Sequence, residues 1–262
     1  MTSLLLIGTA WIGLAVAFGL FFIVARRMNN YGVVDIVWSY AFAALAIFYA
    51  LLGAGWPVRR TLIAGMATLW SVRLGTHLYR RVLSHHPVED GRYAQLRKEW
   101  ATHFIPKMAG FFQIQAASVV LLGAVFFIVC LNRDPHLHPL EIAGAVLWLI
   151  ALVGESVADA QLAAFKRSPD NKGGVCDVGL WHVSRHPNYF FEWLIWVSYF
   201  VFALASPWGW IAAIGPVSIL YLLLRVTGIP LTEEQSVRSK GDAYRRYQQT
   251  TNAFIPWFRK KI

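Results

Sequence analysis

Long apolar runs separated by short polar segments dominate the chain. Seven of these runs reach about 20 residues, the length that an α-helix needs to cross the hydrocarbon core of a bilayer. We expect the helices at about residues 3–24, 33–54, 61–82, 109–131, 139–165, 187–206 and 209–227. The pattern therefore predicts an all-α, polytopic integral membrane protein with seven transmembrane helices.

The composition agrees with this pattern. Hydrophobic residues make up 57% of the 262 positions, charged residues make up 15%, and the mean hydropathy is +0.48. A soluble protein of this length would be less apolar. The net charge of +10 could indicate nucleic acid, but Lys and Arg also gather in the cytoplasmic loops of membrane proteins, where they face anionic headgroups. We expect membrane lipid as a partner and no nucleic acid.

The distribution of basic residues predicts the orientation. Most of the 24 Lys and Arg residues lie in four segments, at residues 25–32, 80–108, 166–186 and after 228. The two hairpins between these segments contain only Arg59, Arg60 and Arg133. Because basic loops stay in the cytoplasm, the N-terminus is expected outside and the C-terminus inside, which agrees with an odd number of spans.

A polar string at residues 179–192 stands between two apolar runs. A proline at the expected first helical turn makes Asn188 and Glu192 neighbours on one helix face. Arg185 and His186 then lie at the helix N-terminus, where backbone N–H groups favour anions. This arrangement suits the phosphates or the ribose of a nucleotide. The alternative is a basic, polar cap at the membrane interface.

Ionisable residues also occur inside the predicted spans, where charges are costly and usually functional. Arg73 and His77 share one helix face by their spacing, and Glu155 and Asp159 share another. Each group alone could be half of a structural ion pair. Together they indicate a polar cavity that opens to the cytoplasm. The full set is Asp35, Arg73, His77, Glu155, Asp159, Glu192 and Arg225.

Several common site motifs are absent from the sequence. It has neither G-x-G-x-x-G after a strand nor G-x-x-x-x-G-K-[ST], so a bound nucleotide would not be held by a Rossmann domain or a P-loop. It also lacks H-E-x-x-H, G-x-S-x-G and paired C-x-x-C motifs, which disfavours hydrolases and zinc sites. Its two cysteines, Cys130 and Cys176, are expected at opposite membrane faces, so we expect neither a disulfide nor a bound metal.

The polar string resembles a known family. Gly179-Leu-Trp, Ser184-Arg-His-Pro-Asn-Tyr189 and Glu192 are similar to the C-terminal domain of steroid 5-alpha-reductases, including the bacterial homologues grouped as a domain of unknown function, DUF1295. Sterol reductases share this C-terminal pattern. The resemblance is specific in the C-terminal half and looser before about residue 110. Further matching stretches are residues 34–38, 70–75, 158–166, 224–231 and 244–256.

The resemblance implies one membrane domain over residues 1–262, with substrate-side residues in 1–108 and cofactor-binding motifs in 109–262. It implies NADPH in a cavity facing the cytoplasm, here of a bacterial inner membrane. The expected reaction reduces a carbon–carbon double bond conjugated to a ketone, as in 3-oxo-4-ene steroids. The substrate would be a steroid-like or isoprenoid lipid, and the oligomeric state is left open.

Matching positions assign the cofactor. By the resemblance, Asp159, Asn188, Glu192 and Arg225 are expected to hold NADPH. The further expected cofactor contacts are Arg73, Arg92, Tyr93, Glu155, Lys166, Arg185, His186 and Tyr189.

The expected chemistry needs a donor at the substrate carbonyl, because hydride transfer to the β-carbon builds negative charge on its oxygen. A buried carboxyl has a raised pKa and can donate. Asp35 stands where related animal enzymes have a Glu, but Trp70 stands where they have a Tyr. This departure leaves the carbonyl donor open among Tyr40, His77 and the indole of Trp70.

Two other functions remain possible. Membrane methyltransferases of the isoprenylcysteine or phospholipid type also have an Arg-His-Pro-x-Tyr…Glu element and bind S-adenosylmethionine, and Glu233-Glu234 fits them. Asp159 and the seven predicted spans favour the reductase. The third possibility is a lipid-binding or transport protein that needs neither cofactor.

Overall fold

The structure is a computed structural model that describes residues 2–260, apart from the side chain of His85. The chain forms two compact units, Met1–Leu137 and His138–Ile262. Regular structure in the described residues is entirely helical, which confirms the all-α prediction. The units divide after Leu137, whereas the halves assigned from the resemblance meet at residue 108.

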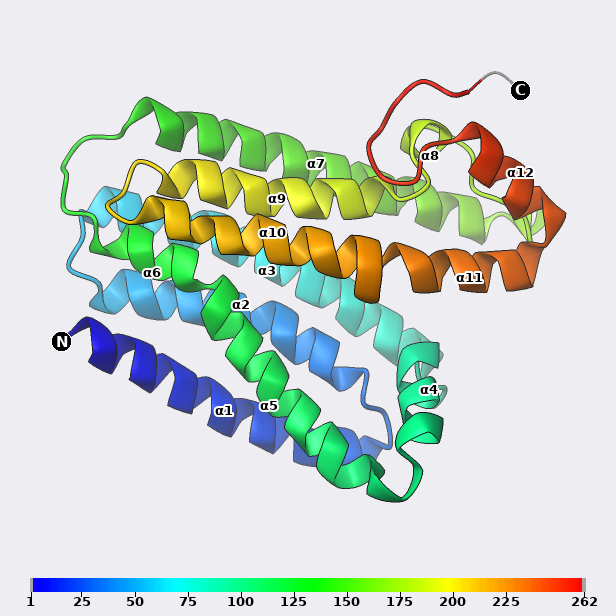
Figure 1. The fold of residues 1–262 in the computed structure, drawn as a ribbon, viewed down its shortest axis with the longest axis horizontal. Helices are drawn as coiled ribbons and strands as arrows, with labels where there is room; N and C mark the ends of the chain where they lie inside the picture. Colours follow the sequence, from blue (N-terminus) through cyan, green and yellow to red (C-terminus); the bar gives the residue numbers. More distant parts are fainter. Residues whose placement is uncertain (1, 261–262) are drawn as a thin grey trace. The chain divides into compact units, whose positions relative to one another are not determined.

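In the N-terminal unit, α2 packs against both α1 and α3, and α1 also lies beside α5 (Figure 1). Close contact between α2 and α3 is fastened by Ser71, whose hydroxyl donates to the Ser39 carbonyl and accepts from the Ala43 N–H at 3.1 Å. The helices of this unit are α1 (Ser3–Met28), α2 (Val33–Leu52), α3 (Pro57–His85), α4 (Gly91–Trp100), η1 (Ala101–His103), α5 (Phe104–Leu122) and α6 (Ala124–Leu131).

In the C-terminal unit, α7 and α9 run side by side (Figure 1). Two glycines of α7 permit the close packing, because a Cβ on Gly144 would lie 2.8 Å from the Phe202 nitrogen and one on Gly154 would overlap the Phe191 ring. The elements are α7 (Pro139–Arg167), η2 (Pro169–Asn171), α8 (Leu180–Val183), α9 (Pro187–Ala203), η3 (Gly209–Ala213), α10 (Ile214–Tyr221), the π-helix η4 (Leu222–Val226), α11 (Ile229–Lys240) and α12 (Asp242–Thr250).

Five helical stretches among the described residues are long and apolar enough to cross a membrane. Their outer faces carry exposed large side chains such as Leu20, Ile114 and Val146, as expected for contact with lipid. The prediction of an integral membrane protein is therefore confirmed. The five stretches are Ser3–Met28, Val33–Leu52, Gly91–Leu131, Pro139–Arg167 and Gly209–Lys240.

Helices occur at all seven predicted places, but two segments differ from expectation. The basic segment 80–108, which lies between two predicted spans, continues α3 and then forms α4. Asp90 starts α4 as its N-cap, with its carboxylate accepting from the Arg92 N–H at 3.0 Å. The polar tail also contains two helices, α11 and α12, before it becomes irregular. Both segments bring side chains to the polar clusters described next.

Candidate functional site

A carboxylate–phenol pair lies near the start of α2. Asp35 accepts a hydrogen bond from the Tyr93 hydroxyl at 2.7 Å, and its other oxygen is 2.7 Å from the Arg92 guanidinium. Tyr93 is only 2% exposed, whereas the Asp35 side chain is 19% exposed. Asp35 and the two residues of α4 were all predicted site residues, and the structure brings them together. Helix α4 thus supplies a phenol to Asp35.

A second carboxylate orients Arg92. The Nε of Arg92 is 3.1 Å from the Asp90 carboxylate, which also forms an ion pair with Arg81. Burial by itself raises the pKa of Asp90, but the charges of Arg92 and Arg81 and hydrogen bonds from Arg92 lower it overall. The Arg92 guanidinium is therefore held between two carboxylates, because it donates to both Asp35 and Asp90.

Two of the other predicted residues of this unit, Trp70 and Tyr40, contact partners other than the pair. Trp70 is buried against Phe42, with ring centroids 5.4 Å apart, and Phe42 is about two helical turns along α2 from Asp35. The Tyr40 hydroxyl is 2.9 Å from a threonine hydroxyl of α3. The remaining two predicted residues are Arg73, which is half-buried, and His77, which is exposed.

In the C-terminal unit, polar side chains meet between α7 and α9. The Asn188 amide donates to Asp159 at 3.3 Å. Glu155 lies one turn before Asp159 and is buried, and Glu192 lies one turn after Asn188. Glu192 accepts from the Trp196 indole at 3.0 Å. We call Glu155, Asp159, Asn188 and Glu192 the polar seam.

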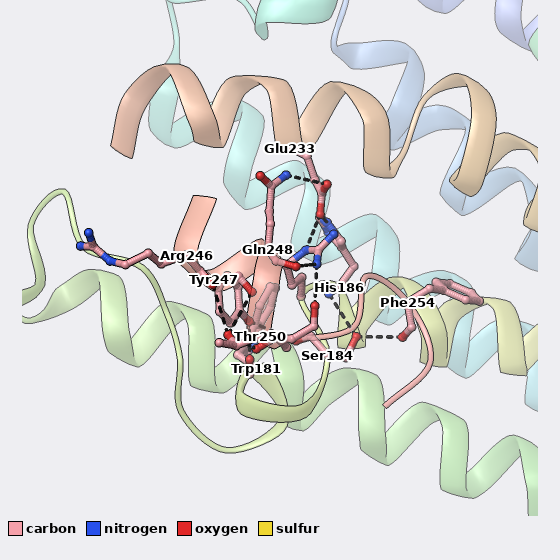
Figure 2. A network of polar contacts seen from close by, with 11 residues as sticks. Trp181, Ser184, His186, Glu233, Arg246, Tyr247, Gln248, Thr250 and Phe254 are labelled. Carbon is pink, nitrogen blue, oxygen red and sulfur yellow. Dashed lines mark hydrogen bonds and ion pairs between the residues drawn. The ribbon is translucent and has the colours of Figure 1, made fainter. Parts of the chain in front are cut away.

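Arg185 is engaged by the chain itself. Its Nε donates to Glu233 at 2.6 Å, and its NH1 donates to the carbonyls of Gln248 at 2.9 Å and Thr251 at 2.5 Å. The Gln248 amide also donates to Glu233 at 2.9 Å (Figure 2). The guanidinium therefore joins the start of α9 to α11 and α12 through its Nε and Nη1 groups.

His186 belongs to the same network. Its Nε2 is 3.3 Å from Glu233, and its ring stacks on Tyr189 at 5.4 Å between centroids (Figure 2 shows the histidine beside the carboxylate). Burial lowers the pKa of His186, against the opposing effect of Glu233. Tyr189 reaches α11, where its hydroxyl is 3.2 Å from Thr232. His186 is thus buried between Glu233 and Tyr189.

Further bonds fasten residues 181–184 to the C-terminal segment. The Tyr247 hydroxyl donates to the carbonyl of Trp181, and the Ser184 hydroxyl donates to the carbonyl of Phe254 at 2.8 Å (Figure 2). The Trp181 indole in turn donates to the Ala158 carbonyl of α7 at 2.9 Å. No local pattern in the sequence predicts this network; its one signal is the resemblance of residues 244–256 to the family.

Two predicted cationic residues point to solvent or lipid. Lys166 lies in the last turn of α7 and Arg225 lies in the π-helix η4, and both are exposed. A π-helical turn is rare and often marks a functional position. Unlike Arg185, these two cations lie at the surface, where a phosphate could reach them.

The donor set of the C-terminal unit suits a nucleotide better than a metal. Carboxylates such as Asp159 and Glu192 can accept hydrogen bonds from ribose hydroxyls, and the surface cations can pair with phosphates. Among the residues that the structure describes, no group of three or more His, Cys, Asp and Glu side chains could hold a metal ion.

Apolar helices long enough to span a bilayer, with carboxylates and an amide between them, define an all-helical integral membrane protein. The chain belongs to the family described as "Protein of unknown function (DUF1295)", which it matches over residues 21–251. It is also similar to "Uncharacterized protein C594.04c" of Schizosaccharomyces pombe, with 26% identity over 257 residues, covering 87% of this chain and 73% of that protein. No solved structure matches the chain.

Proposed function

We propose that the protein is an NADPH-dependent membrane reductase of a carbon–carbon double bond conjugated to a ketone, acting on a steroid-like lipid. The likeness of the DUF1295 group to steroid 5-alpha-reductases supports this function. The observation that carries it is the hydrogen bond between Tyr93 and Asp35. The reaction needs a phenol or an acid at the carbonyl, but Trp70 occupies the position where a Tyr is expected. Tyr93 of α4 supplies a phenol in its place.

The chain's residues then have distinct roles on the proton side. NADPH would supply a hydride to the β-carbon, which leaves negative charge on the carbonyl oxygen. When substrate binds, the Tyr93 hydroxyl turns from Asp35 and donates its one proton to that oxygen, while Arg92 remains paired with Asp35. A water proton completes the product at the α-carbon. This assignment replaces Tyr40, Trp70 and His77 as the carbonyl donor.

On the cofactor side, Asp159 and Glu192 accept hydrogen bonds from ribose hydroxyls, and Asn188 offers its amide. The pairing of Asn188 with Asp159 supports this role, because each group orients the other. Arg225 and Lys166 pair with phosphates. Arg185 acts indirectly, since its guanidinium is used to fix the start of α9.

We further propose seven spans, with α3 and α9 added to the five long apolar stretches. The N-terminus would be outside, the C-terminus in the cytoplasm of a bacterial cell, and the active site open to the cytoplasm. Arg59 and Arg60 lie on the face expected outside the cytoplasm, but they do not contradict this orientation. Arg59 donates to the carbonyls of Asp134 and His136, both at 2.6 Å, and Arg60 donates to that of Gly53 at 2.5 Å, so both have structural partners.

NADPH oxidation by the detergent-purified protein with progesterone or testosterone tests the proposal. We expect a product two mass units heavier, formed only with NADPH. If NADPH stabilises the protein against heat but no steroid turns over, the cofactor assignment stands and the steroid is wrong.

The same thermal assay separates the methyltransferase alternative. Stabilisation by S-adenosylmethionine and none by NADPH would favour it and reject the reductase. The structure gives this alternative no added support, because Glu233 is already bound by Arg185, His186 and Gln248.

A further inference from the structure

The segment after α12, residues 251–260, folds back along the polar string and is called here the return segment. Backbone bonds hold it: the Arg185 N–H donates to the Asn252 carbonyl at 2.9 Å, and the Trp257 N–H donates to the Val183 carbonyl at 3.0 Å. It is therefore a fixed part of the C-terminal unit, and the side chains that it exposes are held in place.

Three of its large apolar side chains face outward. Ile255 is 58% exposed, Trp257 is 66% exposed and Phe258 is 81% exposed. The rings of Trp257 and Phe258 are in contact, with centroids 5.9 Å apart. In water such a cluster would be unfavourable, and single-chain surfaces rarely keep one without a binding role. Aromatic side chains of this kind are typical of the interface between lipid and water.

The return segment is bonded near the part of α7 where the exposed apolar residues of that helix end. It is bonded to residues 183–185, and the adjoining Trp181 is bonded to Ala158 of α7. The exposed apolar residues of α7 extend to Val157, and exposed Lys166 and Arg167 follow. A change from apolar to basic residues along a spanning helix marks the headgroup layer. The aromatic cluster is thus close to that layer.

A polar cavity of about 350 Å³ lies between the return segment, α12 and the loop before α8. On one wall Arg259 is 2.5 Å from Asp177 and lies over the Tyr247 ring at 6.0 Å. Arg246 also lines the cavity, and Figure 2 shows its side chain extending away from the Glu233 network. Within the described chain its guanidinium has no hydrogen-bond or ion-pair partner. The other lining residues are Val175, Ala243 and Thr250.

We propose that this cavity binds the phosphate of an anionic phospholipid headgroup, with Arg246 as its main ligand and the cluster of Ile255, Trp257 and Phe258 in the upper acyl region. A phospholipid accounts for both features, because it pairs its phosphate with Arg246 and covers the aromatic cluster with hydrocarbon. A soluble phosphate would leave the aromatic cluster in water. The proposal does not depend on reductase activity.

Titration of the purified full-length protein in detergent with dihexanoyl phosphatidylglycerol, dihexanoyl phosphatidylcholine and inorganic phosphate tests this site. Phosphatidylglycerol should bind most tightly. Arg246→Gln should weaken its binding about fivefold, since one basic residue near a membrane surface contributes about that much. Arg245→Gln is the matched control: it makes the same charge change on the same helix, and both arginines are exposed, but Arg245 pairs with Asp242 and does not line the cavity.

Equal effects of the two substitutions, or equal affinity for the two lipids, would overturn the site. Full displacement of phosphatidylglycerol by inorganic phosphate of similar affinity would assign the cavity to a soluble phosphate instead.

A second measurement places the aromatic cluster without altering any arginine. Phe258→Cys is labelled with bimane in nanodiscs of phosphatidylglycerol and phosphatidylcholine; the native Cys130 and Cys176 are buried and should not react. Spin-labelled lipids should quench the bimane. An unquenched probe would overturn the membrane contact.

Discussion

Each unit of the molecule contains a carboxylate that is paired with an arginine. The two pairs differ in the other groups that the arginine contacts. Asp35 is bound by Arg92 and Tyr93, which are consecutive on α4. Glu233 is bound by Arg185, which also donates to two carbonyls of the C-terminal segment. The carboxylates are similarly accessible, at 19% and 16% exposed.

The difference separates a structural clamp from the pair that we propose to be reactive. The Glu233 cluster joins segments distant along the chain through the Nε and Nη1 groups of Arg185. The Asp35 cluster consists of side chains only and includes a phenol that can give a proton. An ion pair therefore does not by itself identify a site; the remaining partners of the cation decide its role.

The largest expected effect is on stability, at the clamp. Arg185→Ala should lower the free energy of unfolding by about 3 kcal/mol, because it leaves the half-buried Glu233 carboxylate without its charge partner and two backbone carbonyls without their donor. Thermal unfolding in detergent measures the loss. Arg238→Ala is the control, since it breaks an exposed pair with Glu234 on the same helix as Glu233 and should cost at most about 0.5 kcal/mol. Equal losses would mean that the clamp is not structural.

The next effect is on turnover, at the reactive pair. Tyr93→Phe removes the proposed carbonyl donor and should lower kcat about 100-fold while NADPH binding is kept. Steady-state kinetics and cofactor titration give the two numbers. Tyr79→Phe removes a phenol from an exposed position of α3 and should change neither. Asp35→Ala should likewise keep cofactor binding and lose turnover; unchanged turnover in both variants would contradict the proton-side assignment.

A smaller effect is expected at the polar seam. Asn188→Ala should weaken NADPH binding about tenfold, the cost of one hydrogen bond to a charged or strongly polar group. Isothermal titration measures the affinity. Gln249→Ala removes an amide from an exposed position of α12 and serves as the control. If both variants bind NADPH as tightly as the wild type, the cofactor does not lie on the seam.

The smallest effect concerns pH, again at the clamp. Burial lowers the pKa of His186 below its unfolded value of about 6.5. Above that value His186 is neutral in both states, and its contribution to stability is complete. As pH falls below 6.5 toward the folded pKa, the unfolded state takes up a proton that the folded state resists, so stability decreases. Melting curves of wild type and His186→Gln from about pH 7.5 to 5.5 should show the steeper loss in the wild type.

The sequence alone determined the helical, membrane-embedded character of the protein. Apolar runs of spanning length leave few alternatives, because a lipid-exposed backbone must satisfy its own hydrogen bonds. The i,i+4 spacing also predicted that Glu155 shares a face with Asp159 and that Asn188 shares one with Glu192, and the structure places these four residues together between α7 and α9.

Only the tertiary structure decided which charges are available. Arg185 and Arg246 are the same residue type, so the sequence does not distinguish them. In the structure Arg185 is bound to Glu233, whereas Arg246 lines an open cavity. The local sequence pattern also could not predict the contact between Asp35 and Tyr93, because these residues are 58 positions apart. Periodicity reports which face of a helix is buried; the partner of a polar group depends on how distant segments pack, and that is fixed only in the folded chain.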